Sequence, residues 1–318
     1  MKPKVLVTEA IHPAGWATLK KETEAVAWPG QEKQPLIEAV GDVQAILVRV
    51  VKLPPEVIRA AKQLKIIAKH GVGYDNINVP AATASGVIVT NTPLANSTSV
   101  AEHALALLLA VARRIGESDR DLALNQMRPQ KAYQGIELSG KVLGIIGLGS
   151  AGFRLARMAG QGFGMRVIGF DPYKEPWPEG VERCRELDPL LTQADFISIH
   201  VPLTKETRHL IGRESLPKLK PTCVLVNTSR GGIVDEAALA EAVKAGRLAG
   251  AGLDVVEDEP LRPDHPLNGL PTVILTPHVA GVTEEAMMRM AQDAAEDILR
   301  ILRGERPKYP VNPEVLKK

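Results

Sequence analysis

At 318 residues the chain is long enough for two domains, each with its own hydrophobic core. Its 45% hydrophobic and 24% charged residues are ordinary for a soluble globular protein, and a net charge of +2 gives no reason to expect a nucleic acid or a membrane surface as a partner. Cys184 and Cys223 lack metal-ligand spacing and cannot form a disulfide framework, so we expect no metal site and a cytoplasmic location. The N-terminal MKPKVLVTEA has too short an apolar core for a signal peptide, and no apolar run approaches a membrane span.

Short apolar runs alternate with helix-like segments from Lys4 to Thr90. This alternation predicts a parallel sheet covered by helices, and therefore an α/β domain ahead of any cofactor motif. The predicted strands are Lys4–Val7, Glu24–Ala27, Ala45–Val48, Leu64–Ala68 and Val87–Thr90, and the predicted helices are His12–Lys20, Pro35–Val40, Pro54–Ala61 and Pro80–Ala84.

A long helix is predicted at Val100–Ile115, where Ser99 and Glu102 match a capping box. Its apolar residues fall on one stripe, and the helix is a natural link from the first domain to the second. Residues 117–140 are polar and are predicted to be irregular. They could form an arm that covers a neighbouring subunit, or a surface loop.

The next segment has the order of a dinucleotide-binding unit. Val142–Ile146 is an apolar strand pattern, followed at once by GLGSAG from Gly147 to Gly152. A helix over about Ala151–Gly160 and a second strand at Arg166–Phe170 complete the pattern of strand, turn, helix and strand.

The glycines and the acid of this unit each have a physical task. Gly147 permits the tight turn, Gly149 lets a pyrophosphate approach the backbone, and Gly152 lets helix and strand pack closely. The helix N-terminus presents N–H groups and a positive dipole end to phosphates. Asp171, at the end of the second strand, can accept hydrogen bonds from the adenosine ribose and would repel a 2′-phosphate. The sequence therefore predicts NAD rather than NADP.

The alternation continues to the end of the chain, so the cofactor domain is an insertion. We expect a substrate domain of residues 1–98 and 286–318 and an NAD-binding domain of residues 99–285, with the ligand site in the cleft between them. The remaining predicted strands are Phe196–His200, Cys223–Asn227, Ala251–Val255 and Val273–Leu275, and the helices are Asp235–Ala245 and Glu284–Leu302.

Three residues after predicted strands match the needs of hydride transfer to a keto acid. That chemistry needs a cation for the carboxylate, a proton donor for the oxygen, and a carboxylate that orients the donor. Arg230 in NTSRGG, His278 in LTPHVAG and Glu259 in DVVEDEP supply these groups. Each alone could be a structural or solvated side chain. Because the carboxyl ends of parallel strands face the ligand crevice, all three can reach one site.

With these residues in place, the sequence resembles the D-isomer-specific 2-hydroxyacid dehydrogenase family along essentially its whole length. The resemblance implies a Rossmann-like NAD domain inserted into a flavodoxin-like substrate domain, and commonly a homodimer. Formate dehydrogenases of this superfamily have Gln where Glu259 stands, so Glu favours alcohol and ketone chemistry. The matching segments are HGVGYDNIN, NSTSVAEHALALLLA, GLGSAG, VPLTKETRHLI, NTSRGGIVDE, GLDVVEDEP and TPHVAG.

The resemblance also implies roles for single residues. Arg230 would bind the substrate carboxylate and carbonyl, His278 would be the acid/base with Glu259 as its partner, and backbone N–H groups of Val72 and Gly73 would face the carboxylate. Many members read GLGRIG, with an Arg at the pyrophosphate; here Ser150 and Ala151 follow Gly149, so we expect weaker NAD binding. The further cofactor contacts implied are Thr98 near the nicotinamide, Val201, Pro202 and Thr207 at the adenosine, and Thr228, Ser229 and Asp254 at the nicotinamide end.

Two basic residues bear on the identity of the acid. Arg49 and Lys69 end predicted strands, and two cations there suit a substrate with a phosphate or a second carboxylate, as in the phosphoglycerate dehydrogenase branch of serine biosynthesis. Alternatively, Arg49 caps a strand and Lys69 is solvated, which leaves a glyoxylate/hydroxypyruvate reductase or a broad keto-acid reductase. A redox-inert NAD-sensing scaffold is a further alternative. No regulatory ligand-binding domain is expected after the proline-containing tail that ends at Lys318.

Overall fold

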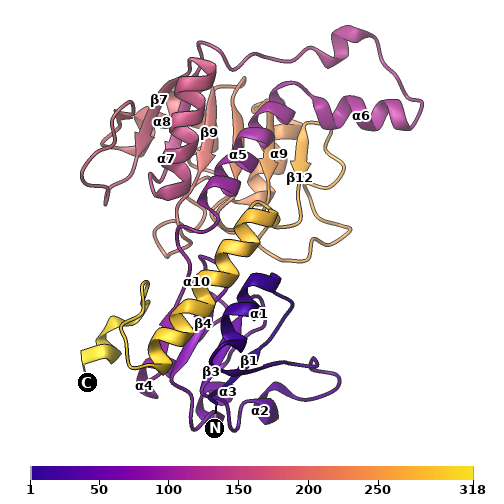
Figure 1. The fold of residues 1–318 in the computed structure, drawn as a ribbon. Helices are drawn as coiled ribbons and strands as arrows, with labels where there is room; N and C mark the ends of the chain where they lie inside the picture. The colour runs from indigo at the N-terminus through magenta and orange to yellow at the C-terminus, as the bar shows by residue number, and fades with distance from the viewer. Residues whose placement is uncertain (1, 318) are drawn as a thin grey trace. The chain divides into compact units, whose positions relative to one another are not determined.

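A computed structural model describes residues 2–317 of the chain. The chain divides into two compact units, one made of the residues up to Asn96 together with those from Val282 onward, and the other made of Ser97–Gly281. The sequence predicted domains of residues 1–98 with 286–318 and of residues 99–285. In the structure the first boundary lies after residue 96 and not after 98, and the second lies before residue 282 and not before 286. Each unit holds a parallel sheet with helices on both faces, which confirms the predicted α/β fold class (Figure 1).

The sheet of the first unit has the strand order β2-β1-β3-β4-β5, and every neighbouring pair is parallel. This is the order of flavodoxin-like folds, in which ligands bind at the carboxyl ends of the strands. The strands are β1 (Lys4–Val7), β2 (Glu24–Ala27), β3 (Ala45–Val48), β4 (Ile66–Lys69) and β5 (Ile88–Thr90).

Alternate strand residues of the first unit face opposite helix layers. Val5 and Val7 pack in one core with residues of α1 (Pro13–Lys20) and α10 (Glu284–Leu302), which Figure 1 shows side by side. A Cβ on Gly15 of α1 would lie 2.8 Å from Ala291 of α10, so glycine permits this close approach. The opposite core lies under α2 (Leu36–Ala39), α3 (Pro55–Ala60) and α4 (Val79–Ala84).

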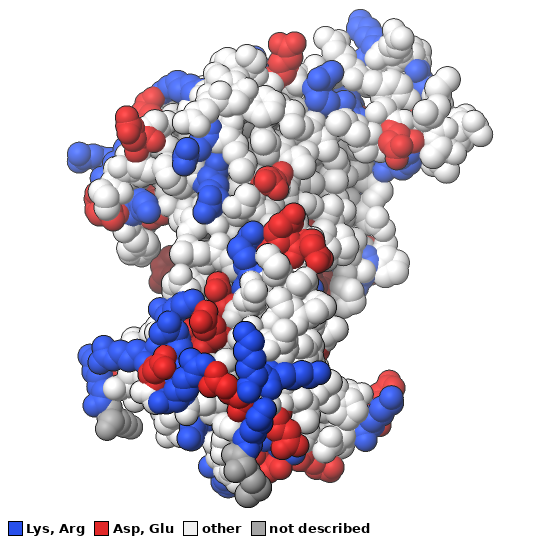
Figure 2. Space-filling model, viewed as in Figure 1, with Lys and Arg blue, Asp and Glu red and all other residues white. Residues whose placement is uncertain are grey.

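Ion pairs tie the C-terminal part of α10 to its surroundings. Arg303 pairs with Glu22, and the Nζ of Lys308 lies 3.0 Å from a carboxylate oxygen of Glu296. Figure 2 shows acidic and basic side chains intermixed on the face of this unit that is in view. The 3-10 turn η4 (Pro313–Lys317) ends the described chain.

The sheet of the second unit has the order β12-β11-β10-β9-β6-β7-β8, again with parallel neighbours. The order reverses at β6, so the carboxyl edge beside β6 and β9 is a topological switch point, where dinucleotides bind in doubly wound folds. The strands are β6 (Val142–Ile146), β7 (Arg166–Phe170), β8 (Glu182–Arg183), β9 (Phe196–Ile199), β10 (Val224–Asn227), β11 (Gly250–Leu253) and β12 (Val273–Leu275).

Two hydrophobic cores sandwich this second sheet. One lies between the strands and α5 (Ser97–Ala112) with α7 (Ser150–Arg157), which continues into the π-helical turn η2 (Met158–Gly162). The other lies under α8 (Leu187–Gln193), α9 (Glu236–Lys244) and the turn η3 (Leu216–Lys218). Among residues 2–317, no helix is both long and apolar enough to cross a membrane.

Two predictions around the linking helix are wrong. The helix α5 begins at Ser97 and ends at Ala112, so Ser99 lies inside its first turn and is not the cap. Part of the segment predicted to be irregular forms α6 (Ile115–Ala123), followed later by the short turn η1 (Gln130–Tyr133). The sequence pattern did not predict α6 because ion pairs, and not an apolar stripe, hold this helix. Glu117 is buried and pairs with Arg114 at 2.7 Å and Arg128 at 2.6 Å.

Candidate active site

The GLGSAG turn between β6 and α7 has the geometry that a dinucleotide requires. Gly147 has φ +92°, and a Cβ there would lie 2.7 Å from the carbonyl oxygen of His200. A Cβ on Gly152 would lie 2.1 Å from the carbonyl oxygen of Gly147, so only glycine permits this packing of helix against strand. A Cβ on Gly149 would meet nothing within 4 Å, which leaves this face of the turn open. The backbone is therefore accessible to a pyrophosphate where the sequence predicts it.

The carboxylate of Asp171 fixes this turn from the neighbouring strand end. Its Oδ2 accepts a 2.8 Å hydrogen bond from the N–H of Leu148, and its Oδ1 accepts one of 3.0 Å from Tyr173. No side chain of the described residues caps the N-terminus of α7 at Gly149. The first-turn N–H groups, at Ser150 and Ala151, are thus available for an anion.

Other predicted cofactor residues lie at the carboxyl ends of β9 and β10. Val201 packs against Gly147, and Thr207 donates a 2.7 Å hydrogen bond to the carbonyl of Pro202, which closes that loop. The hydroxyl of Thr228 is buried and has no hydrogen-bond partner among the described residues. A buried hydroxyl without a partner is costly, so a bound ligand that supplies one fits this position. Thr98 lies in the first turn of α5.

The Arg230 loop is shaped by Asn227, the last residue of β10. The buried side chain of Asn227 accepts hydrogen bonds from the N–H and the hydroxyl of Ser229, at 3.0 and 2.8 Å, and donates one of 2.8 Å to the carbonyl of Arg230. A Cβ on Gly231 would lie 2.0 Å from the carbonyl oxygen of Val256. The loop after β10 therefore packs directly on the loop after β11.

His278 and Glu259 form the pair that the sequence predicts. Nδ1 of His278 lies 2.9 Å from Oε2 of Glu259, and the two side chains are 50% and 40% exposed. Burial raises the pKa of the Glu259 carboxyl, but the hydrogen bond and the charge of His278 outweigh it and hold the pKa below its usual value. An ionised Glu259 can therefore orient the imidazole and stabilise its charged form.

Asp254 holds the loop that carries His278. The Asp254 side chain is buried, and its carboxylate accepts hydrogen bonds from the Thr276 hydroxyl at 2.6 Å and from the N–H groups of Val279 and Ala280 at 2.9 and 2.8 Å. Burial raises its pKa, but these donors together with His103 lower it overall. His278 has φ +54°, a backbone conformation that non-glycine residues rarely adopt, and the Asp254 hydrogen bonds to the next two N–H groups hold the backbone of this loop.

In the first unit, the loop after β4 presents unused backbone donors. The N–H of Gly71 donates to the hydroxyl of Thr92 at 3.1 Å, and the carbonyl of Val72 accepts a 2.7 Å hydrogen bond from Asn91. Within residues 2–317 no hydrogen bond uses the N–H of Val72 or Gly73. These two groups are thus free for the substrate carboxylate that the sequence predicts there.

The two basic residues of this unit are held differently. Lys69 is buried, and its ammonium donates to the carbonyl of Arg49 and, at 2.9 Å, to Oδ1 of Asn76. The Arg49 guanidinium makes no hydrogen bond or ion pair with the described residues. Burial and the nearby charge of Arg49 lower the pKa of His70 to about 4, so this imidazole is neutral at pH 7. Lys69 mainly braces the strand ends, whereas Arg49 is available to a ligand.

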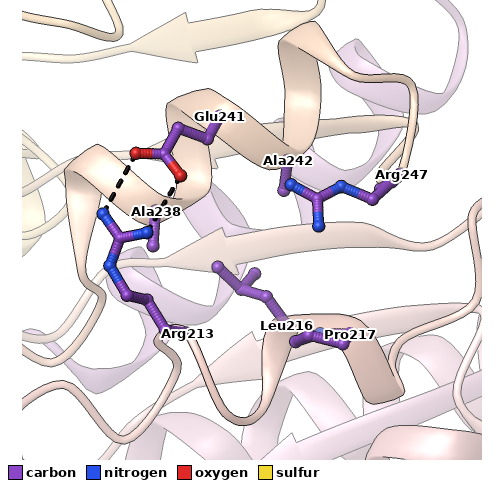
Figure 3. Close-up of a pocket in the computed structure, with 7 residues that line it drawn as sticks. All are labelled: Arg213, Leu216, Pro217, Ala238, Glu241, Ala242 and Arg247. Carbon is purple, nitrogen blue, oxygen red and sulfur yellow. Dashed lines mark hydrogen bonds and ion pairs between the residues drawn. The ribbon is translucent and has the colours of Figure 1, made fainter.

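A separate hollow on the second unit lies between α9 and η3 (Figure 3). Arg213 and Glu241 pair across its rim through two 3.0 Å hydrogen bonds. None of its lining residues belongs to the predicted site. Among the described residues there is also no group of three or more His, Cys, Asp or Glu side chains that could hold a metal ion.

The strand orders of the two sheets, the open glycine turn and the His278–Glu259 pair define a class, the nicotinamide dinucleotide-dependent oxidoreductases. The sequence profile described as "D-isomer specific 2-hydroxyacid dehydrogenase, NAD binding domain" matches residues 105–280. The chain belongs to the D-isomer-specific 2-hydroxyacid dehydrogenase family and is an NAD-dependent oxidoreductase acting on hydroxy acids.

Similar proteins divide between two activities. A glyoxylate reductase of Korarchaeum cryptofilum is 43% identical over 100% of this chain and 98% of its own length. A D-3-phosphoglycerate dehydrogenase of Archaeoglobus fulgidus is 44% identical over 97% of this chain, which spans 59% of that relative. The crystal structure of the TT0316 protein from Thermus thermophilus superposes with a TM-score of 0.89 at 37% identity, covering 97% of this chain and 99% of that one.

Proposed function

We propose that the chain interconverts a 2-keto acid and its D-2-hydroxy acid with Arg230, Glu259 and His278 as the catalytic residues. The observation that carries this proposal is the 2.9 Å pairing of His278 with Glu259 at the carboxyl edge of the second sheet. A redox-inert scaffold does not need a proton donor whose charged form is stabilised by a carboxylate. Turnover of any 2-keto acid with NADH tests the assignment against that alternative.

In the reducing direction, imidazolium His278 gives its proton to the developing alkoxide, and Glu259 stabilises the charged ring. The guanidinium of Arg230 holds the substrate carboxylate and polarises the carbonyl. The unused N–H groups of Val72 and Gly73 also bind that carboxylate. The bound nicotinamide supplies the hydride in this direction and accepts it in the other.

The cofactor is held at the GLGSAG turn and the loops beside it. Gly147, Gly149 and Gly152, with the N–H groups of Ser150 and Ala151, bind the pyrophosphate. At the nicotinamide end the proposed contacts are Thr98, Thr228, Ser229 and Asp254, and at the adenosine they are Asp171, Val201, Pro202 and Thr207. The buried, unpartnered hydroxyl of Thr228 supports this assignment.

We expect Asp171→Asn to raise the ratio of kcat/KM for NADPH over NADH by at least about tenfold, or about 1.4 kcal/mol. The substitution removes the charge that repels a 2′-phosphate, yet Asn keeps an oxygen for the N–H of Leu148. Steady-state kinetics with both cofactors measures the change. An unchanged ratio in a variant with an unchanged Tm contradicts the proposed role of Asp171.

The best candidate substrate is D-3-phosphoglycerate, with 3-phosphohydroxypyruvate as its keto form, because the unpaired guanidinium of Arg49 suits a phosphate. Lys69, already braced by Asn76, contributes positive charge to the same end of the sheet. The alternative is a glyoxylate/hydroxypyruvate reductase or a broad keto-acid reductase. The similarity to both kinds of enzyme leaves the choice to experiment.

NADH oxidation at 340 nm over 3-phosphohydroxypyruvate, hydroxypyruvate, glyoxylate and pyruvate tests this choice. For Arg49→Ala we expect kcat/KM for the phosphorylated acid to fall about 10- to 100-fold, the scale of one charge-assisted hydrogen bond, with glyoxylate turnover nearly unchanged. A wild-type preference for glyoxylate that persists in Arg49→Ala overturns the phosphoglycerate assignment and favours the reductase.

We also propose a cytoplasmic homodimer that serves serine biosynthesis. Three apolar side chains in and after α6 support the dimer, since Leu122, Leu124 and Met127 are 61%, 57% and 71% exposed. Sedimentation equilibrium is expected to give twice the 34.2 kDa mass of the chain, and Leu122→Glu with Met127→Glu is expected to give the monomer. A monomeric wild-type chain excludes this state.

A further inference from the structure

A buried pair beneath the Glu259 loop belongs to none of the roles above. Glu236 is the first residue of α9, His265 lies in the long loop after β11, and both are only 8% exposed. Nε2 of His265 lies 2.8 Å from Oε2 of Glu236. The second carboxylate oxygen of Glu236 accepts a 2.7 Å hydrogen bond from the N–H of Glu257.

These contacts place Glu236 between the two arms of one loop. Glu257 precedes Glu259 in the chain and His265 follows it, so a single carboxylate ties the segment on both sides of the catalytic Glu259. Other contacts restrain the same segment, because the Glu257 carboxylate pairs with Arg208 and Gly231 packs against the Val256 carbonyl. Among the residues that restrain this segment, Glu236 is the buried one that contacts it on both sides of Glu259, and we call it the anchor.

We propose that Glu236 and His265 are positioning residues for the reaction, because they fix the loop that aims the Glu259 carboxylate at His278. This inference rests on the proposed function of Glu259 and His278. Loss of the anchor lets the Glu259 loop shift, and a displacement of about 1 Å at a catalytic group can cost 100-fold in rate.

The hydrogen bonds of Glu236 determine what the isosteric substitution Glu236→Gln changes. The N–H of Leu267 lies 3.4 Å from Nδ1 of His265, so Nδ1 is the acceptor and Nε2 carries the proton. Glu236 therefore accepts one hydrogen bond at each oxygen. Glu236→Gln keeps the size but offers one oxygen, so its amide nitrogen faces a second donor, either Glu257 N–H or His265 Nε2–H.

The test measures kcat, KM, NADH affinity and the pH profile of NADH oxidation with glyoxylate and 3-phosphohydroxypyruvate. We expect Glu236→Gln and His265→Leu to lower kcat about 10- to 100-fold, with NADH affinity within about twofold of wild type. Imidazolium His278 is needed for reduction, so a misplaced Glu259 moves the alkaline loss of activity to lower pH. His265→Gln keeps a donor for Glu236 and is expected to retain most of the activity.

The matched control is Glu241→Gln on the same helix, whose side chain pairs with Arg213 at the surface (Figure 3) and is expected to leave all these quantities unchanged. A folded Glu236→Gln variant with wild-type kcat and pH profile overturns the inference. So does a loss of activity that only follows the fraction of unfolded protein while the pH profile stays fixed. His278→Ala, measured beside them, separates the two proposals, since full turnover by that variant refutes the proposed function itself.

Discussion

Replacing His278 by Ala is expected to lower the kcat of keto-acid reduction by about 10²- to 10⁴-fold, the range for losing a general acid. The ring is half exposed and paired through Nδ1 with Glu259, which leaves Nε2 to meet the substrate oxygen. NADH binding, measured by fluorescence titration, is expected to stay within about twofold, because the predicted cofactor contacts do not include His278.

Glu259→Gln is a second, milder variant of the same His278–Glu259 pair. Gln keeps the oxygen that faces Nδ1 but removes the charge that favours imidazolium, so we expect a smaller loss that grows as the pH rises. The Glu259 carboxyl has a lowered pKa, so its negative charge is present at neutral pH and disappears only in acid. If His278→Ala turns over normally while binding NADH, the proton donor is another group and the mechanism is wrong.

The cofactor turn was predictable because its signals are local. A tight turn, an open backbone and a close helix–strand packing each require glycine at one position, and Gly147, Gly149 and Gly152 meet these requirements in the structure. The alternation of strands and helices was readable for a similar reason, since β-branched apolar runs such as Val142–Ile146 have few alternatives to a buried strand.

The residues that shape the catalytic loops were not predictable in the same way. Asn227 ends β10 and Asp254 directly follows β11. The resemblance implied Asp254 only as a nicotinamide contact, yet each of the two residues is buried and organises a loop through several backbone groups. His103 of α5 lies 3.0 Å from the Thr276 hydroxyl and 3.4 Å from Asp254, a contact between residues far apart in sequence. A polar side chain at the end of an otherwise apolar strand was the available signal.

The helix α6 and the hydrogen bonds of the Lys69 ammonium were not predicted for a related reason. The short helix α6 has charged residues where a periodicity analysis looks for apolar ones, and Arg128, which pairs with its Glu117 and Asp121, comes later in the chain. Lys69 looked like a solvated or ligand-binding cation, but its ammonium is used by Asn76 and a backbone carbonyl. In both cases the partner that decides the outcome is not adjacent in sequence.

The packing of the two catalytic loops on each other leads to the second large expected effect. A Cβ at position 231 would lie 2.0 Å from the carbonyl oxygen of Val256 and 2.5 Å from the backbone nitrogen of Glu257, distances that a backbone can relieve only by moving. Arg230 precedes this glycine and Glu259 follows the opposing segment, so Gly231→Ala pushes the proposed carboxylate-binding residue away from the loop that carries Glu259, the partner of His278. We expect kcat/KM to fall at least about 100-fold and the stability to fall by about 1–3 kcal/mol.

Gly162→Ala is the matched control, because a Cβ there would meet nothing within 4 Å, and we expect it to leave both quantities unchanged. Thermal unfolding and steady-state kinetics on the two variants separate loop displacement from general sensitivity to alanine. If Gly231→Ala retains wild-type kcat/KM, the loops can relax without changing the active geometry. That result would show that packing between the loops after β10 and β11 does not fix the positions of Arg230 and Glu259.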